Sequence, residues 1–350
     1  MRRSTRRRLR ILLLLVLASA LVGVLYGGMI GHVFRETGLV GGAIGAIDGI
    51  LISVPIASLE IFGLRTRWGS ALQRAPFMVT FSLKWLAYGA VISLVNLRSP
   101  GVRLVGLVTL TAPLPGSVVL ASVAFSFGMA FAFLFLVQLG QMVGLRTLGH
   151  ILFGRYHRPH LEDRFFLFVD IRGSTTLAER IGPAGVHRFL AAVFRLASDP
   201  IGDHRGEIYQ YVGDEMVVTW TLAAGREDAR PLACFFSIEA ALQGASPVFE
   251  REFGAAPRLR AALHAGPVIS GEIGDTKREI VFHGDVMNTA ARLEEATRDL
   301  DRQFLVSAEA LKRLNGAERY DRELLGPHTL RGRAAPVEIY AITNGHQAGQ

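Results

Sequence analysis

The sequence predicts two folds joined in one chain: an N-terminal all-α domain of four transmembrane helices and a C-terminal α+β domain. Three observations lead to this prediction. Half of the 350 residues are hydrophobic, but long apolar runs with few charges are confined to residues 11–140. Residues 155–345 have the composition of an ordinary globular domain. That C-terminal part also places apolar stretches of strand length next to helical patterns.

These shifts in composition set the predicted domain boundaries. We expect a four-span transmembrane anchor over residues 1–140, a juxtamembrane linker over 141–163 and a soluble domain over 164–345. The linker mixes apolar and basic residues, which is typical of a segment at the inner membrane surface. It is either a plain tether or an element that couples the two domains.

The four predicted spans follow from length and hydrophobicity. A helix needs about 20 mainly apolar residues to cross a bilayer, and the stretches that meet this lie at about 11–30, 39–63, 76–97 and 117–140. The first is interpreted as a retained helix because its apolar run is long for a signal peptide and no clear cleavage site follows. Small residues allow the second span to pack closely against a neighbour, namely Gly41, Gly42, Gly45 and Gly49.

Arginines predict how the anchor is oriented. Six of the first ten residues are Arg. On the same predicted side lie Arg65, Arg67, Arg74, Arg146, Arg155 and Arg158, against Arg35 (beside Glu36), Arg98 and Arg103 on the other. The positive-inside rule then places both termini and the soluble domain in the cytoplasm. We therefore expect a multi-pass protein of the cell's inner (plasma) membrane. Because topology explains much of the net charge of +8, we predict a lipid bilayer partner and no nucleic acid.

Three charged residues lie within or near the predicted spans: Asp48, Glu60 and Lys84. A charge at the centre of a membrane costs about 2.5–3.5 kcal/mol on insertion scales, so it needs a partner or a function. We favour either an ion pair of Lys84 with Asp48 or Glu60 between neighbouring helices, or a Glu60 side chain that simply reaches the membrane interface. A role in sensing a signal is the alternative.

A carboxylate ends the first predicted strand of the soluble domain. Residues 165–171 form an apolar run that contains Asp170 near its end, and a helical pattern follows to about Leu196. Gly173, Ser174 and Thr175 stand at the helix start, where Ser or Thr is expected to cap it. A carboxylate beside free helix N–H groups suits a metal-bound polyphosphate.

A second carboxylate lies in a predicted hairpin over residues 207–220, whose turn holds Gly213 and Asp214. Two Asp residues on neighbouring strand ends can bracket two cations, the arrangement that serves in-line displacement at phosphorus.

A third pattern predicts a helix from Val286 to about Arg298, capped by Asp285. Asn288 and Arg292 share one face of it, either as a ribose-triphosphate contact or as an ordinary solvated face.

Together, these motifs resemble the signature blocks of class III adenylate and guanylate cyclases. The matching blocks are F-V-D-I-R-G-S-T, V-G-D-E forty-four residues after the first Asp, and G-D-V-M-N-T-A-A-R-L. The resemblance covers roughly residues 164–342. It implies a βαββαβ, ferredoxin-like palm with extra elements. It also implies a head-to-tail homodimer with two active sites across its interface.

The resemblance also implies roles for individual residues. Two Mg²⁺ or Mn²⁺ ions per site would be held by Asp170, Asp214 and the backbone carbonyl of Ile171. The substrate would be contacted by Gly173, Ser174, Thr175, Gln210 and Val281. From the opposite subunit, Asn288 would orient the ribose and Arg292 would stabilise the transition state, and Arg331 would hold phosphate. The ribose 3′ oxygen would attack the α-phosphorus and pyrophosphate would leave.

The positions that usually read the base depart from the family pattern. Gln210 stands where adenylate cyclases usually have Lys, and Val281, which offers no side-chain hydrogen bond, stands where they have Asp or Thr. We expect ATP as substrate, with GTP possible. The alternatives are therefore a guanylate cyclase or an inactive, nucleotide-sensing module. A diguanylate cyclase is disfavoured, because Val212 and Met216 replace the second Gly and the Phe of its G-G-D-E-F loop.

Overall fold

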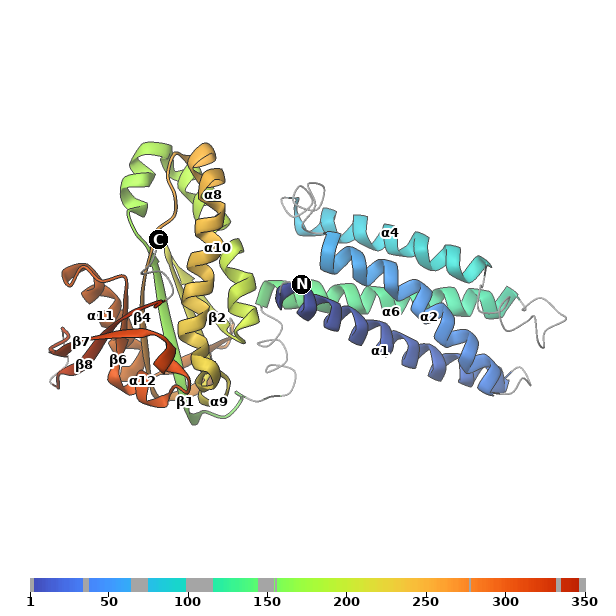
Figure 1. The fold of residues 1–350 in the computed structure, drawn as a ribbon. Helices are drawn as coiled ribbons and strands as arrows, with labels where there is room; N and C mark the ends of the chain where they lie inside the picture. The colour runs from blue at the N-terminus through green and yellow to red at the C-terminus, as the bar shows by residue number, and fades with distance from the viewer. Residues whose placement is uncertain are drawn as a thin grey trace. The chain divides into compact units, whose positions relative to one another are not determined.

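The computed structural model describes residues 3–33, 38–63, 75–98, 116–143, 154, 156–276, 278–331 and 335–345. Its contacts divide the chain into two compact units, Met1–Leu148 and Gly149–Gln350. Figure 1 shows a bundle of long helices in the first unit and a sheet flanked by helices in the second.

The described part of the first unit is helical. Its helices are α1 (Arg3–Val33), α2 (Gly38–Phe62), α4 (Phe77–Arg98) and α6 (Gly116–Val143). Each contains a stretch long and apolar enough to cross a membrane, at the four places predicted. The arginines used to predict orientation lie mostly outside the described residues, namely Arg2, Arg35, Arg65, Arg67, Arg74, Arg103, Arg146 and Arg155, as does Glu36.

Glycines let α1 and α2 meet backbone to backbone. A Cβ on Gly45 would overlap the carbonyl oxygen of Gly23, and one on Gly27 would overlap that of Gly41. A Cβ on Gly49 would lie 2.8 Å from the Ser19 carbonyl oxygen, and the Ser19 hydroxyl donates to the Gly49 carbonyl at 3.0 Å. The predicted close packing of the second helix is thus made against the first, and side chains at these positions would force the helices apart.

A buried ion pair joins α2 to α4. Lys84 Nζ lies 2.9 Å from both carboxylate oxygens of Glu60, and the Tyr88 hydroxyl donates to Glu60 as well. Lys84 and Glu60 are 5% and 8% exposed. The ion pair predicted for Lys84 therefore exists, with Glu60 as its partner.

The second unit contains one mixed sheet of eight described strands, in the order β2-β3-β1-β4-β6-β8-β7, with β5 paired to β4. All neighbouring strands are antiparallel except the parallel pair β4 and β6. The strands are β1 (His160–Ile171), β2 (Glu207–Val212), β3 (Glu215–Thr221), β4 (Leu259–Ile273), β5 (Glu279–His283), β6 (Phe304–Ser307), β7 (Asp321–His328) and β8 (Val337–Thr343).

The first part of this unit has the βαββαβ order that the resemblance implies: β1, α8 (Ser174–Asp203), β2, β3, α10 (Arg230–Phe253), β4. The short α9 (Leu222–Arg226) precedes α10, and α11 (Asp285–Asp299) and α12 (Ala308–Arg313) follow β5 and β6. Single 3-10 turns lie at Glu227–Ala229 and Ala317–Arg319. The remaining strands extend the sheet beyond β4.

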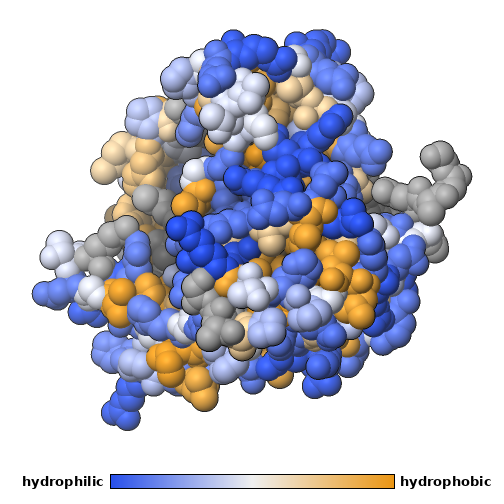
Figure 2. Space-filling view, turned by 90° about the vertical axis from the view of Figure 1, so that its left-hand side faces the viewer, coloured by the Kyte–Doolittle hydropathy of each residue, from blue (hydrophilic) through white to orange (hydrophobic). Residues whose placement is uncertain are grey.

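Helices cover both faces of β1. Because side chains alternate along a strand, Phe165, Leu167 and Val169 pack in the core shared with α8 and α10, while Phe166 and Phe168 pack against α11. The stretch Leu222–Phe253 is also long and apolar enough to span a membrane, but α10 within it supplies core side chains to this sheet. The side that carries α11, β7 and β8 is mostly hydrophilic with separate apolar patches (Figure 2), as expected for a water-facing domain.

Two predicted helix caps are wrong. Gly173, with φ of 75°, takes the N-cap position of α8, and Ser174 is already its first residue. Gly284 takes that position at α11, with Asp285 as the first residue. Helix α8 also runs past Leu196 to Asp203, with a break at Gly182, where φ is 74°.

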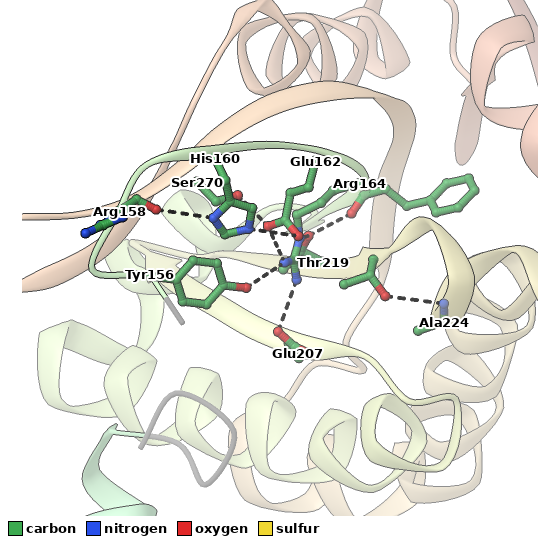
Figure 3. A network of polar contacts seen from close by, with 11 residues as sticks. Tyr156, Arg158, His160, Glu162, Arg164, Glu207, Thr219, Ala224 and Ser270 are labelled. Carbon is green, nitrogen blue, oxygen red and sulfur yellow. Dashed lines mark hydrogen bonds and ion pairs between the residues drawn. The ribbon is translucent and has the colours of Figure 1, made fainter. Parts of the chain in front are cut away.

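A buried arginine ties the start of β1 to its neighbours (Figure 3). Arg164 is 1% exposed. It donates to Thr219 on β3 at 3.1 Å, to Glu207 on β2 at 3.1 Å, to Glu162 at 3.0 Å and to the Tyr156 hydroxyl at 3.2 Å. Tyr156 belongs to the predicted linker, so the described end of that segment is fastened to the sheet. Linker residues 144–153 and 155 lie outside the described residues.

We predict that Arg164→Met strongly destabilises the sheet unit. The change would leave Glu162 and Glu207 without their buried cation, and breaking such a pair costs about 3–5 kcal/mol. Thermal or denaturant unfolding of the full chain in detergent measures the loss.

Arg172→Met is the matched control. Arg172 follows β1 and pairs at 3.6 Å with Asp301, whose side chain is 89% exposed, so its loss should cost about 0–1 kcal/mol. Equal losses from the two variants would contradict the importance of the Arg164 network.

Candidate active site

Strand β1 carries Asp170 into the edge of the core. Asp170 lies opposite Glu215 of β3 and Arg260 of β4, and it points to the same face as Phe166 and Phe168, the face that α11 covers. It is 5% exposed. The next residue, Ile171, is buried on the opposite face, so only its backbone is available to a ligand on the Asp170 side.

The β2–β3 hairpin brings Asp214 to the same end of the sheet. Gly213 adopts φ of 63° at the turn, a left-handed conformation that suits glycine, and Asp214 follows just before β3. The Ser174 hydroxyl, at the start of α8, donates to the Asp214 carboxylate. The two carboxylates and the start of α8 therefore meet, as the sequence predicts, although Ser174 bonds a side chain rather than capping its own helix.

Acidic side chains crowd this corner. Burial raises the pKa of Asp170, and the neighbouring charge of Asp214 raises it further, while Arg298 opposes both effects. Burial, Glu294 and Asp170 raise the pKa of Glu215 to about 7. Burial and Asp170 likewise raise the pKa of Glu294 to about 7, again against Arg298. The site thus carries more negative charge than its own residues neutralise.

These residues fit a hard divalent cation. Asp170 and Asp214 offer carboxylate oxygens, the ligands that Mg²⁺ and Mn²⁺ prefer, and their mutual repulsion would be relieved by a cation. Among the described residues, no group of three or more His, Cys, Asp or Glu side chains is arranged to hold a metal. A cation here would therefore combine the two carboxylates with a backbone carbonyl, waters and substrate phosphates, which is usual for Mg²⁺.

Of the other predicted residues, Gly173 and Thr175 flank Ser174 at the start of α8, and the rest are spread over other elements of the same chain. Asn288 is exposed on α11, and the Arg292 side chain is 37% exposed with Glu295 3.9 Å away. Gln210 is exposed on β2, where the strand has an irregularity between Ile208 and Gln210. Val281 lies on β5 opposite Gly271, and exposed positions are also held by Gly173, Thr175 and Arg331.

Sequence reasoning missed three charged residues of this corner: Glu215, Glu294 and Arg298. Arg298 Nη2 donates to Asp170 Oδ2 at 3.3 Å. Glu294 is 4% exposed and lies one helical turn before Arg298. Glu215 follows Asp214 in the V-G-D-E block, and the i, i+4 spacing of Glu294 and Arg298 was visible in the sequence, but nothing local indicated that they face Asp170.

Known proteins share both the sequence and the fold. Residues 159–344 match the profile of the adenylate and guanylate cyclase catalytic domain. "Adenylate cyclase 2" of Rhizobium meliloti (strain 1021) is 33% identical over 347 residues, covering 97% of this chain and 91% of the relative. "Adenylate cyclase 1" of the same strain is 27% identical over 180 residues, 50% of this chain and 27% of the relative. A bacterial light-regulated adenylyl cyclase structure shares the fold, with a TM-score of 0.53 at 21% identity over 63% of this chain and 64% of that one.

We predict that Glu294 makes the metal-free protein less stable as pH rises. Its pKa is about 7 in the fold against 4.5 as a free side chain, so the folded state binds the extra proton between these values and stability falls as pH rises through them. A Glu294→Gln side chain stays neutral. Its Tm in EDTA should therefore exceed that of the unmodified chain increasingly from about pH 4.5 to above pH 7.

Glu295→Gln, on the exposed side of the same helix, is the control and should follow the unmodified chain at every pH. A constant Tm difference between Glu294→Gln and the unmodified chain across this range would contradict the prediction.

Proposed function

Because this chain belongs to the family of adenylate and guanylate cyclase catalytic domains, we propose that it converts ATP into 3′,5′-cyclic AMP and pyrophosphate at the inner face of a membrane. The observation that carries the proposal is the meeting of Asp170 and Asp214 beside the start of α8, in the two family blocks where metal ligands are expected.

In this proposal, Asp170 and Asp214 hold two Mg²⁺ or Mn²⁺ ions together with the carbonyl of Ile171. When bound, these ions supply charge stabilisation at the phosphates and acidify the 3′ hydroxyl. Ser174 keeps the Asp214 carboxylate oriented. Gly173, Ser174 and Thr175 present the N-terminus of α8, whose free N–H groups and dipole favour a phosphate.

We propose that the remaining groups come from a second copy of the chain. Asn288 and Arg292 lie on accessible positions of α11 and are directed to the ribose and the transition-state charge of the partner's site. The planar guanidinium of Arg292 suits the developing phosphoryl charge. Arg331 is proposed as a phosphate contact. Two active sites would then form in one symmetric dimer.

ATP is proposed over GTP because of the relative called adenylate cyclase 2, which matches this chain along nearly all of its length. Gln210 and Val281 are proposed as substrate contacts. Gln210 can donate to and accept from a base edge, whereas Val281 supplies only apolar contact.

The four apolar helices of the first unit are proposed as the membrane anchor, with both termini in the cytoplasm.

The first experiment measures product from the full chain in detergent, given ATP or GTP with Mg²⁺ or Mn²⁺. Cyclic AMP is expected, and Asp214→Asn should lower its rate at least about a hundredfold, the scale of losing one electrostatic group at a reacting centre. Asp163→Asn on the same β1 strand is the control, because that side chain is 43% exposed and pairs with Arg313 at 3.7 Å.

Cyclic GMP in this experiment would replace ATP by GTP as the substrate. No product from either nucleotide, with a folded dimer confirmed, would favour a nucleotide-sensing module over an enzyme.

The second experiment tests the shared site by mixing inactive chains. Asp170→Ala and Arg292→Ala each damage a different half of the proposed site, so a mixed dimer keeps one intact site of two. Mixed dimers isolated through two tags should regain about half of the normal activity per dimer. The control pair, Asp170→Ala with Asp214→Ala, damages the same half and should regain none. Equal activity from both pairs would reject the shared site.

A further inference from the structure

Arg298 holds the carboxylate that a metal ion would need. Its guanidinium donates to Asp170 Oδ2 at 3.3 Å, and the two side chains differ sharply in exposure, 57% for Arg298 and 6% for Asp170. The arginine therefore approaches the buried carboxylate from the solvent side, at the end of α11. Because Asp170 is its one ion-pair partner within 4 Å among the described residues, the half-exposed guanidinium can leave without disturbing the core.

A second acceptor lies within reach of the same helix turn. Glu294 precedes Arg298 by four residues and is 4% exposed, and its Oε1 has no hydrogen-bond partner among the described residues. A buried carboxylate oxygen without a partner is costly. The order Glu then Arg at i, i+4 is also the favourable direction for a helical ion pair. Arg298 is thus hydrogen-bonded to Asp170, and Glu294 offers it a second carboxylate to which it is not hydrogen-bonded.

A metal ion and Arg298 compete for Asp170. Both are cations, both require the Asp170 carboxylate, and two positive charges a few ångströms apart in a partly buried site repel each other. The ion can therefore bind fully only when the guanidinium leaves. Transfer to Glu294 keeps the guanidinium charge paired and satisfies the unpartnered Oε1.

We propose that Arg298 is a positioning residue that neutralises Asp170 in the metal-free enzyme and transfers to Glu294 when Mg²⁺ or Mn²⁺ binds. The inference rests on the proposed function, in that Asp170 is taken as a metal ligand. It does not depend on which nucleotide is the substrate. Arg298 thereby sets the metal concentration at which Asp170 becomes available to the ion. Glu294 provides the position to which the guanidinium moves.

The proposal predicts effects of opposite sign for the two residues. Removing the competing cation with Arg298→Gln should tighten Mn²⁺ binding at least about fivefold, the lower end of usual coupling between two binding events. Glu294→Gln removes the alternative partner, so Arg298 stays on Asp170 and Mn²⁺ binding weakens. In the double variant Arg298 is absent, so Glu294→Gln should lose most of its effect.

The test is Mn²⁺ binding to the full chain in detergent, without nucleotide, followed by the electron paramagnetic resonance signal of the free ion. Arg302→Gln is the matched control, because Arg302 lies four residues beyond Arg298 and pairs with Glu323 at 2.8 Å; it should leave Mn²⁺ affinity unchanged. The unfolding temperature in EDTA is a second readout, and Arg298→Gln should lower it by leaving the buried Asp170 carboxylate without its ion-pair partner.

Asp170→Asn separates failure of this inference from failure of the proposed function. If Asp170→Asn leaves Mn²⁺ binding unchanged, the metal assignment itself is wrong. If Asp170→Asn weakens binding but Arg298→Gln does not tighten it, Arg298 does not compete and the inference alone fails. If Glu294→Gln weakens binding equally with and without Arg298, Glu294 acts through its charge only and the transfer is rejected.

Discussion

A carboxylate that loses its water must be compensated by cations or hydrogen-bond donors, and this requirement at Asp170 organises the site. Strand β1 is covered by helices on both faces, so its last residues are drawn out of solvent along with the apolar ones before them. Asp214 then adds a second negative charge instead of relieving the first. Among the described residues, the half-exposed guanidinium of Arg298 is the charge that pairs with Asp170, where a fixed network of donors would have produced an inert structural acid.

The two ends of β1 differ in how their buried charges are compensated, as a comparison of Asp170 with Arg164 shows. At the start of β1, the buried Arg164 has two carboxylates, a hydroxyl and a phenol as partners, together with the ring of Phe282 at 4.6 Å from its guanidinium carbon. That charge is fully compensated by the chain itself and fixes the strand in place. At the other end the balance is left negative, and a negative balance is what a cationic ligand requires.

Features that depend on short stretches of sequence could be predicted, and those that depend on distant contacts could not. The strand ending near Asp170, the hairpin at Asp214 and the helix carrying Asn288 each follow from local pattern, and all three are present. The cap of α8 was misassigned because Ser174 bonds Asp214, which lies forty residues away in sequence. Glu294 and Arg298 were missed because only the packing of α11 on the sheet shows what they face.

The helical unit shows the same difference between features set by local sequence and features set by distant contacts. Length and hydrophobicity located the four helices, and the need to pair a charge in an apolar setting identified Lys84 as half of an ion pair. The choice of Glu60 over Asp48 required the arrangement of α2 against α4. Tyr88 adds a hydroxyl to the same carboxylate, a contribution that no sequence pattern indicated.

The glycine contacts between α1 and α2 have a mechanical consequence. Helices that touch through side chains can slide by rotamer changes, but backbones in contact at Gly23, Gly27, Gly41 and Gly45 have no side chains to rearrange. Moving from one set of contacts to the next equivalent set requires a step of four residues, about 6 Å along the axis. We therefore expect the two helices to move as one rigid unit. A translation or rotation of one helix is then transmitted to the other without a change in their register.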